Sequence, residues 1–146
     1  MLIMDIIQAT NPKRYFHTID PYGAKPFLAR KRAIPGFYND GQYLEMMSTL
    51  APRKQRWTHW KMRSLDWAEM YPNIEFWSDD GQLSDEFCFV YLDGDHATEP
   101  VKKEVEFFMP RTHGYILIDN ADHIEPDQLG VDYVVEDDAV VIKCEP

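Results

Sequence analysis

An α/β fold with a mainly parallel sheet is predicted by three observations on the sequence. Apolar strand-like runs alternate along the chain with segments of helical spacing. One run, Phe87–Leu92, is continuously apolar, which is typical of a strand buried on both faces of a parallel sheet. The 146 residues, 45% of them hydrophobic, suffice for one domain spanning residues 1–146. We therefore expect a single α/β domain of about five or six strands, with an antiparallel C-terminal edge.

The first 52 residues predict two helices and one strand. A short helix is expected where Leu2, Ile3, Ile6 and Ile7 recur at helical spacing before an Asn-Pro stop at 11–12. Residues 15–19 predict a strand that ends in the turn residues 20–23. The basic segment 24–36 is expected to be irregular. Residues 43–50 predict a helix ended by Pro52, whose buried face is formed by Tyr43, Met46, Met47 and Leu50.

The second half predicts the centre and the edge of the sheet. Residues 58–62 predict a strand and 67–71 one helical turn, and Asp-Asp-Gly at 79–81 suggests the turn of a small hairpin. After the nearly central strand Phe87–Leu92, residues 101–109 predict an amphipathic helix ended by Pro110. Residues 115–118 predict the adjacent parallel strand. Residues 131–135 and 139–144 predict a closing hairpin around 136–138.

Polar residues follow the carboxyl ends of four predicted strands, which is the strongest functional signal in the chain. In open α/β sheets, ligands bind beyond the carboxyl ends of the strands. We therefore expect a site at this edge. The residues in question are Asp20, the pair Ser64 and Asp66, the segment 93–96, and the pair Asp119 and Asn120.

Asp93, Asp119 and Asn120 are candidate metal ligands. They follow neighbouring strands, and carboxylate and amide oxygens suit Mg²⁺ or another hard divalent cation. Such an ion could lower the pKa of a substrate hydroxyl. The alternative is that these residues satisfy turns or cap helices, as Asp and Asn often do.

Asp95 and His96 are candidate general bases at the start of the loop that leads into the 101–109 helix. Histidine commonly exchanges protons near neutral pH, and a carboxylate beside a metal can accept one. The alternative is that Asp95 or Thr98 caps the helix. His17 and His59 fall inside predicted strands, so we expect structural roles for both.

Composition bounds the environment and the partners. The net charge of −10 disfavours binding to a nucleic-acid backbone. No run approaches the roughly 20 apolar residues of a membrane helix, and the N-terminus has no signal-peptide pattern. Two cysteines do not form a disulfide framework. These features predict a cytoplasmic protein that binds neither nucleic acid nor membranes.

The segment FVYLDGDHATEPVKKEVEFFMPRTHGYILIDN, residues 89–120, resembles the strand–helix–strand core of class I S-adenosylmethionine-dependent methyltransferases. The resemblance is to the group that contains macrocin-type sugar O-methyltransferases and related small "DGDH" proteins. FHTIDPYG resembles the family's second strand, KMRSLDW the segment after its third strand, and VDYVVEDDAVVIKC its last antiparallel strands. A Rossmann-like methyltransferase sheet is what this resemblance implies.

The resemblance also implies roles for the strand-end residues. Asp20 matches the acidic residue that binds the ribose hydroxyls of S-adenosylmethionine, and Ser64 and Asp66 match the segment that brackets the adenine. Asp93 falls in the cofactor-binding DGD motif. Asp93, Asp119 and Asn120 match the metal ligands of the metal-dependent O-methyltransferases. Asp95 matches the proposed general base of the sugar enzymes, and His96 follows it in the same loop.

The family's first strand and Gly-rich loop have no counterpart before the predicted first helix, which implies an N-terminally truncated sheet. In the family this strand lies beside both the second and the fourth strands. The chain is then a fragment or shortened product, or another chain completes the sheet, or the protein no longer methylates. We expect a homo-oligomer, most simply a dimer. The function that follows is methyl transfer to a hydroxyl of a small molecule or sugar. The alternative is a non-catalytic binding or assembly module that reuses the fold.

Overall fold

The computed structural model describes residues 6, 9, 14–21, 27–29, 32–34, 40–52, 57–73, 75–77, 82–94 and 96–145. Ten strands and three α-helices fall within this part of the chain, together with three short 3₁₀ helices. In chain order they are β1 (Phe16–Ile19), β2 (Phe27–Ala29), β3 (Arg32–Ile34), α2 (Asp40–Leu50), β4 (Trp57–Trp60), α3 (Ser64–Met70), β5 (Phe76–Trp77), β6 (Leu83–Ser84), β7 (Phe87–Leu92), α4 (Thr98–Phe108), η1 (Met109–Arg111), β8 (Thr112–Asp119), η2 (Ala121–His123), η3 (Pro126–Leu129), β9 (Val134–Glu136) and β10 (Ala139–Lys143).

The strands form mixed parallel and antiparallel sheets, as an α/β fold requires. The largest sheet has four strands in the order β7-β8-β10-β9. Its β7–β8 pair is parallel, and β10 pairs antiparallel with both β8 and β9. β1 and β4 form a separate parallel pair. The predicted parallel adjacency of the strands at 87–92 and 115–118 is therefore confirmed, as is the C-terminal hairpin.

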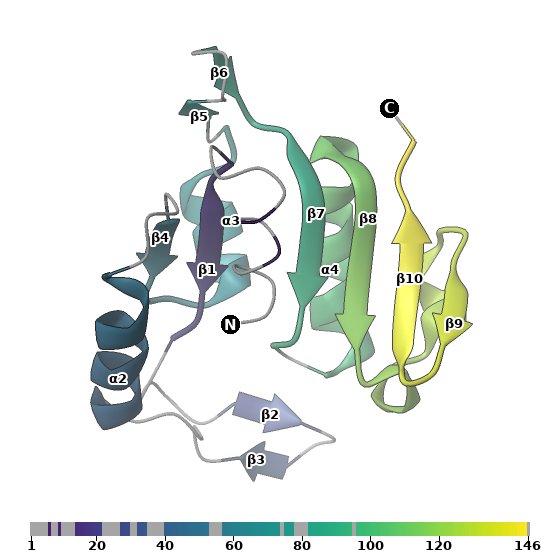
Figure 1. Ribbon diagram of the computed structural model, residues 1–146. Coiled ribbons are helices and arrows are strands. Elements are labelled where there is room, and N and C mark those ends of the chain that lie inside the picture. The colour runs from purple at the N-terminus through teal and green to yellow at the C-terminus, as the bar shows by residue number, and fades with distance from the viewer. Residues whose placement is uncertain are drawn as a thin grey trace.

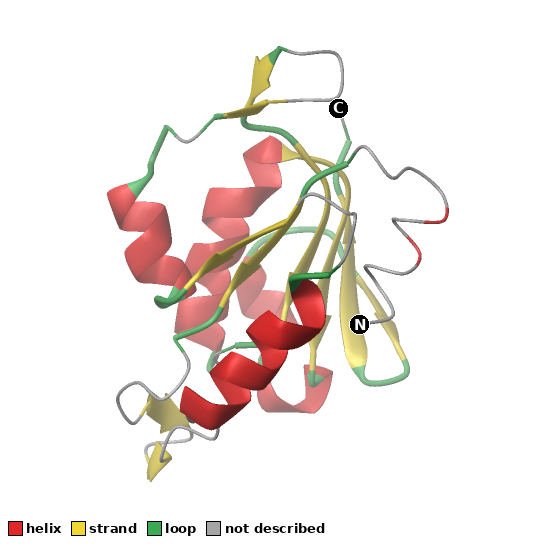
Figure 2. Cartoon of the chain, turned by 60° about the vertical axis from the view of Figure 1, so that its left-hand side comes forward, coloured by secondary structure: helices red, strands yellow, loops and turns green. Residues whose placement is uncertain are grey.

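The two parallel pairs point the same way. Figure 1 shows the order β4, β1, β7, β8, β10, β9 across the molecule, with the arrowheads of β1, β7 and β8 toward the same end. α4 lies behind β7 and β8 in this view. Figure 2 shows α2 nearest the viewer and the other helices beyond the strands. The carboxyl ends of four strands, β1, β4, β7 and β8, therefore share one edge.

Helical periodicity predicted the helices well but placed their starts too late. α2 begins at Asp40 and turns the expected face inward, with Leu50 buried. α3 begins at Ser64 rather than at residue 67, and α4 begins at Thr98 rather than at residue 101. The first turn of a helix is often polar, because its N–H groups favour acidic neighbours. Asp66 and Glu99 occupy those turns and carry no apolar period.

Three expectations about the strands are corrected or fall outside the described residues. Segment 24–36, expected to be irregular, contains the antiparallel hairpin β2–β3. β5 and β6 form the predicted small hairpin, although its turn at 78–81 lies outside the described residues. Of the helix expected around residues 2–7, only Ile6 is described; it is helical, as is Ala9.

The expectation that β7 is buried on both faces is wrong, although β7 lies between β1 and β8 in Figure 1. β7 is an end strand of the four-stranded sheet. Val90 and Leu92 are buried beneath α4, whereas Phe89 is 41% exposed and Tyr91 42% exposed. A continuous apolar run indicates hydrophobic side chains on both faces of a strand, but it does not indicate whether other elements pack on both faces.

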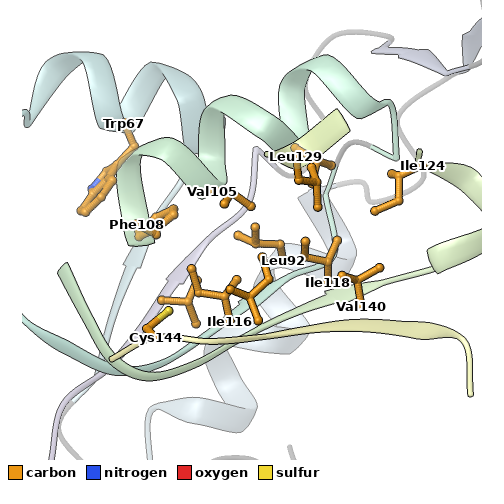
Figure 3. Packing of buried hydrophobic residues seen from close by; sticks show 13 residues of the cluster. Trp67, Leu92, Val105, Phe108, Ile116, Ile118, Ile124, Leu129, Val140 and Cys144 are labelled. Carbon is orange, nitrogen blue, oxygen red and sulfur yellow. The ribbon is translucent and has the colours of Figure 1, made fainter. Parts of the chain in front are cut away.

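One hydrophobic core joins the four-stranded sheet to α4 and α3 (Figure 3). Alternate residues of β7, β8 and β10 point to the same side, where they meet the amphipathic face of α4. Trp67 of α3 is 1% exposed and stacks on Phe108 of α4 at 6.1 Å between ring centroids. The buried members are Trp67, Val90, Leu92, Val101, Val105, Phe108, Ile116, Ile118, Ile124, Leu129, Val140, Ile142 and Cys144. None of the helices in the described residues is long and apolar enough to span a membrane.

Candidate functional site

Asp93 and Asp119 meet at the carboxyl ends of β7 and β8. The register pairs Leu92 with Ile118, so the next residue of each strand emerges side by side. The Asp93 carboxyl is partly desolvated although the residue is exposed. This desolvation raises the pKa of Asp93, and the charge of Asp119 and a side-chain hydrogen bond with it raise that pKa further. Two of the three predicted metal ligands are therefore brought together.

Tyr91 joins this pair and was not predicted from the sequence. It lies two residues before Asp93, and its hydroxyl is hydrogen-bonded to Asp119. Desolvation, the charges of Asp93 and Asp119 and this hydrogen bond raise the pKa of Tyr91 to about 12. The phenol is consequently a neutral donor at physiological pH. The period of two along a strand could have pointed to Tyr91, because residues 91 and 93 share one side of β7.

His96 and His123 contact each other, and the charge of His96 acts on Asp93. Their ring centroids are 5.5 Å apart, with the rings perpendicular. The positive charge of His96 lowers the pKa of Asp93, opposing the effect of Asp119. His123 Nε2 is 3.5 Å from the Asp122 carboxylate. The His96 ring is therefore close enough to the Asp93 carboxyl for its charge to act on it.

Asn120 follows Asp119 in a left-handed backbone conformation, with φ 56° and ψ 60°. Its carbonyl accepts a hydrogen bond of 2.9 Å from the His123 N–H. Asn adopts this conformation more readily than most residues, so the turn itself accounts for Asn at this position. The turn role and a ligand role for its side-chain oxygen are compatible, because the backbone and the amide are separate groups.

Asp20 belongs to the same edge, across from β7. Its backbone N–H donates to the Trp60 carbonyl at 3.1 Å, which fixes it at the end of the β1–β4 pair. Burial lowers the pKa of His59, and the charge of Asp20 opposes that shift. The same charge adds a small upward contribution to the pKa of Asp93, after burial and Asp119. Carboxylates from three strand ends, β1, β7 and β8, are thus close enough to act on one another. Among the residues that the structure describes, no three His, Cys, Asp or Glu side chains form a ready-made metal cluster.

The other predicted residues lie away from this cluster or outside the described residues. Ser64 Oγ donates to the Glu104 carboxylate on α4, so the serine bridges α3 and α4. Asp66 is exposed in the first turn of α3. Asp95 lies outside the described residues. Thr98 does not cap α4, because its hydroxyl accepts a hydrogen bond of 3.0 Å from the Glu125 N–H and the N-cap residue is Ala97.

The two strand histidines have structural surroundings, as expected. His59 Nδ1 is 2.7 Å from the Thr18 hydroxyl, across the β1–β4 pair. His17 lies against Phe76, with 4.1 Å between ring centroids. Burial lowers the pKa of His17 to about 4. Its Nδ1 is buried without a hydrogen-bond partner among the described residues.

Comparison with known proteins identifies no relative of this chain. No protein-family model matches the chain. The search of curated proteins and the search of solved structures each find no significant match. Arguments about function therefore depend on the residues at the strand ends.

Proposed function

We propose that this chain is an S-adenosylmethionine-dependent O-methyltransferase-like protein that acts on a hydroxyl of a small molecule or sugar, with a divalent cation at Asp93 and Asp119. The observation that carries the proposal is the convergence of Asp20, Asp93 and Asp119 at the carboxyl edge of the parallel strands. These are the positions at which the resembling family binds its cofactor and its metal.

Strand order supports the same proposal. In that family, the first strand lies between the second and the fourth. The counterparts of the second and fourth strands here are β1 and β7, which lie side by side in Figure 1 in separate sheets of the described residues. The antiparallel β10 next to β8 matches the family's closing strands. A Rossmann-like methyltransferase sheet is the fold on which the proposal rests.

The donors fit the cofactor and the cation. Asp20 would accept hydrogen bonds from the ribose hydroxyls, and a carboxylate is suited to such a pair of donors. Burial raises the pKa of Asp93, and the charge of Asp119 and a side-chain hydrogen bond with it raise that pKa further, so the two carboxylates repel each other when both are charged. A divalent cation between them would relieve that repulsion, with the Asn120 amide oxygen as a third donor.

Each group would have a defined task. The cofactor supplies the electrophilic methyl group. The strand-end carboxylates would hold the acceptor hydroxyl in line with that methyl group. Such positioning lowers the activation barrier of the transfer. His96, close to Asp93, would take the hydroxyl proton. Tyr91 would hold Asp119 in place through its hydroxyl.

Calorimetric titration tests the cofactor. The wild type should bind S-adenosylmethionine and S-adenosylhomocysteine, and Asp20→Ala should lose most of this affinity. Asp132→Ala removes an exposed aspartate elsewhere and should bind as the wild type does. Absence of binding by the wild type, with and without Mg²⁺, would reject the proposal.

Thermal unfolding tests the cation. Millimolar Mg²⁺, Mn²⁺ or Ca²⁺ should raise the melting temperature of the wild type by mass action but leave that of Asp119→Ala unchanged. If both proteins respond alike, the metal part of the proposal is wrong, and the carboxylates are turn residues.

A binding or assembly module is the second candidate. It is favoured by the exposed apolar side chains on the face of β7 and β8 that no helix of the described residues covers, because an isolated domain has no structural need to expose them. The cofactor titration separates the two candidates, because a module without chemistry has no reason to bind S-adenosylmethionine.

A further inference from the structure

One face of the four-stranded sheet is apolar and uncovered within the described residues. α3, α4 and η3 contribute the core on the other face, and Figure 1 shows α4 on one side of β7 and β8 only. The cross-strand pairs align one apolar row over all four strands. From one edge of the sheet to the other this row consists of Tyr91, Leu117, Val141 and Val134.

The rows on either side of this apolar row carry opposite charges. Toward one end, the register aligns Phe89, Tyr115 and Lys143. Toward the other end, it aligns Asp119 and Glu136 on either side of Ala139. One end of the face therefore carries a single basic side chain, Lys143, and the other end carries two carboxylates, with an apolar row between.

Exposure along the face exceeds what scattered surface residues explain. Tyr115 is 50% exposed and Val134 59%, in addition to the half-exposed Phe89 and Tyr91. Contiguous apolar patches of this kind mark protein interfaces, and aromatic side chains contribute strongly to such interfaces.

We propose that this face docks on the same face of a second copy of the chain, about a two-fold axis that crosses the strands at the apolar row. This rotation places the row that contains Lys143 in one subunit over the acidic row of the other subunit. Lys143 then lies over Ala139 of the partner subunit, flanked by Asp119 of the partner subunit and Glu136 of the partner subunit. A face stacked without this reversal would place acidic row on acidic row, which costs free energy.

The geometry meets the requirements of sheet packing. Alternate residues along a strand are ~6.7 Å apart and facing sheets pack ~10 Å apart, so a Lys side chain can reach across to the opposing row. An isologous contact also closes on itself and gives a dimer rather than a fibre. The contact covers Tyr91 and includes Asp119, so dimerisation places Lys143 of the partner subunit beside the Asp93–Asp119 pair. The inference does not depend on the proposed function.

Sedimentation velocity on the full chain tests the apolar contact. The wild type should be a dimer at micromolar concentration, and Tyr115→Glu and Val134→Glu should each raise the dimer Kd at least about tenfold, or ~1.4 kcal/mol. Leu44→Glu, at an apolar α2 residue that is 65% exposed, should leave the dimer intact. A monomeric wild type, or a dimer indifferent to both substitutions, overturns the proposal.

A charge exchange tests the orientation. Lys143→Glu and Glu136→Lys should each weaken the dimer, and the double variant should recover much of the loss, because Lys143 lies next to Glu136 of the partner subunit across the interface. All these side chains are exposed, so circular dichroism should show unchanged folding. A double variant as weak as the worse single variant overturns the arrangement.

Discussion

Asp119 and Asp93 share a side-chain hydrogen bond at the ends of adjacent parallel strands. Burial, the charge of Asp119 and this hydrogen bond raise the pKa of Asp93, so the fold opposes the charged form of the Asp93 carboxyl. A ligand that carries positive charge would reverse that preference. Binding of either a proton or a cation at this pair therefore stabilises the folded state.

Asp93→Asn should raise the melting temperature at neutral pH. The pKa of Asp93 is raised in the folded state, so the stabilising protonated form is present at low pH and is lost as the pH rises through that pKa. Asparagine keeps a donor toward Asp119 without the charge. The gain over the wild type should therefore shrink as the solution is acidified. Melting curves across the acid range check this, and a variant less stable than the wild type at neutral pH would contradict it.

His17→Phe should make the protein less sensitive to acid. Burial lowers the pKa of His17 from 6.5 to about 4, so the folded state holds the neutral ring. The stability linked to His17 is present above pH 6.5 and is lost as the pH falls toward 4, by up to about 3 kcal/mol. Phenylalanine keeps the packing against Phe76 and does not titrate.

Urea unfolding of His17→Phe and the wild type at several pH values measures the difference. His113→Phe is the control, because His113 is an exposed histidine paired with Glu86 at 3.2 Å. The control should retain the acid sensitivity of the wild type. Parallel pH profiles for the wild type and His17→Phe would show that another group controls acid unfolding.

Gly114→Ala should destabilise the fold by about 2 kcal/mol or more, the size of an overpacked core position. A Cβ on Gly114 would lie 2.2 Å from the Cys88 carbonyl oxygen, at the register shift between Phe87 and Phe89. The matched control is Gly94→Ala, where a Cβ meets nothing within 4 Å. It should change the free energy of unfolding by less than about 0.5 kcal/mol. Chemical denaturation of both variants decides the point, and equal effects would contradict the clash.

Ser64→Ala should cost about 1–3 kcal/mol, because the Glu104 carboxylate is 4% exposed and loses the donor that Ser64 supplies from α3. Ser48→Ala is the control: its hydroxyl donates to the Glu45 carbonyl at 2.8 Å on an exposed face of α2, where water replaces it. Thermal unfolding should separate the two variants. If Ser64 also binds adenine, Ser64→Ala should lose more free energy of cofactor binding than free energy of unfolding.

The sequence by itself determined the elements around the site. The apolar period of α4, the runs of β7 and β8 and the closing β9–β10 hairpin are local patterns, and each was predicted close to its observed range. The site edge followed from the same patterns, because Asp20, Asp93, Asp119 and Asn120 are the residues at which those runs stop. The carboxyl ends of parallel strands lie at the same edge of a sheet, independently of the conformation of the loops that connect them.

Only the tertiary structure decided which groups those residues meet. β7 has apolar residues on both sides, but only the Val90 side is covered, because α4 packs there and the described residues place no helix on the Tyr91 side. Ser64 was predicted at the site, yet its hydroxyl is bonded to Glu104, 40 residues away. Tyr91 joined the carboxylates through Asp119, a partner on another strand. Burial and hydrogen bonding depend on contacts between distant segments, and a local pattern cannot encode which distant segment arrives.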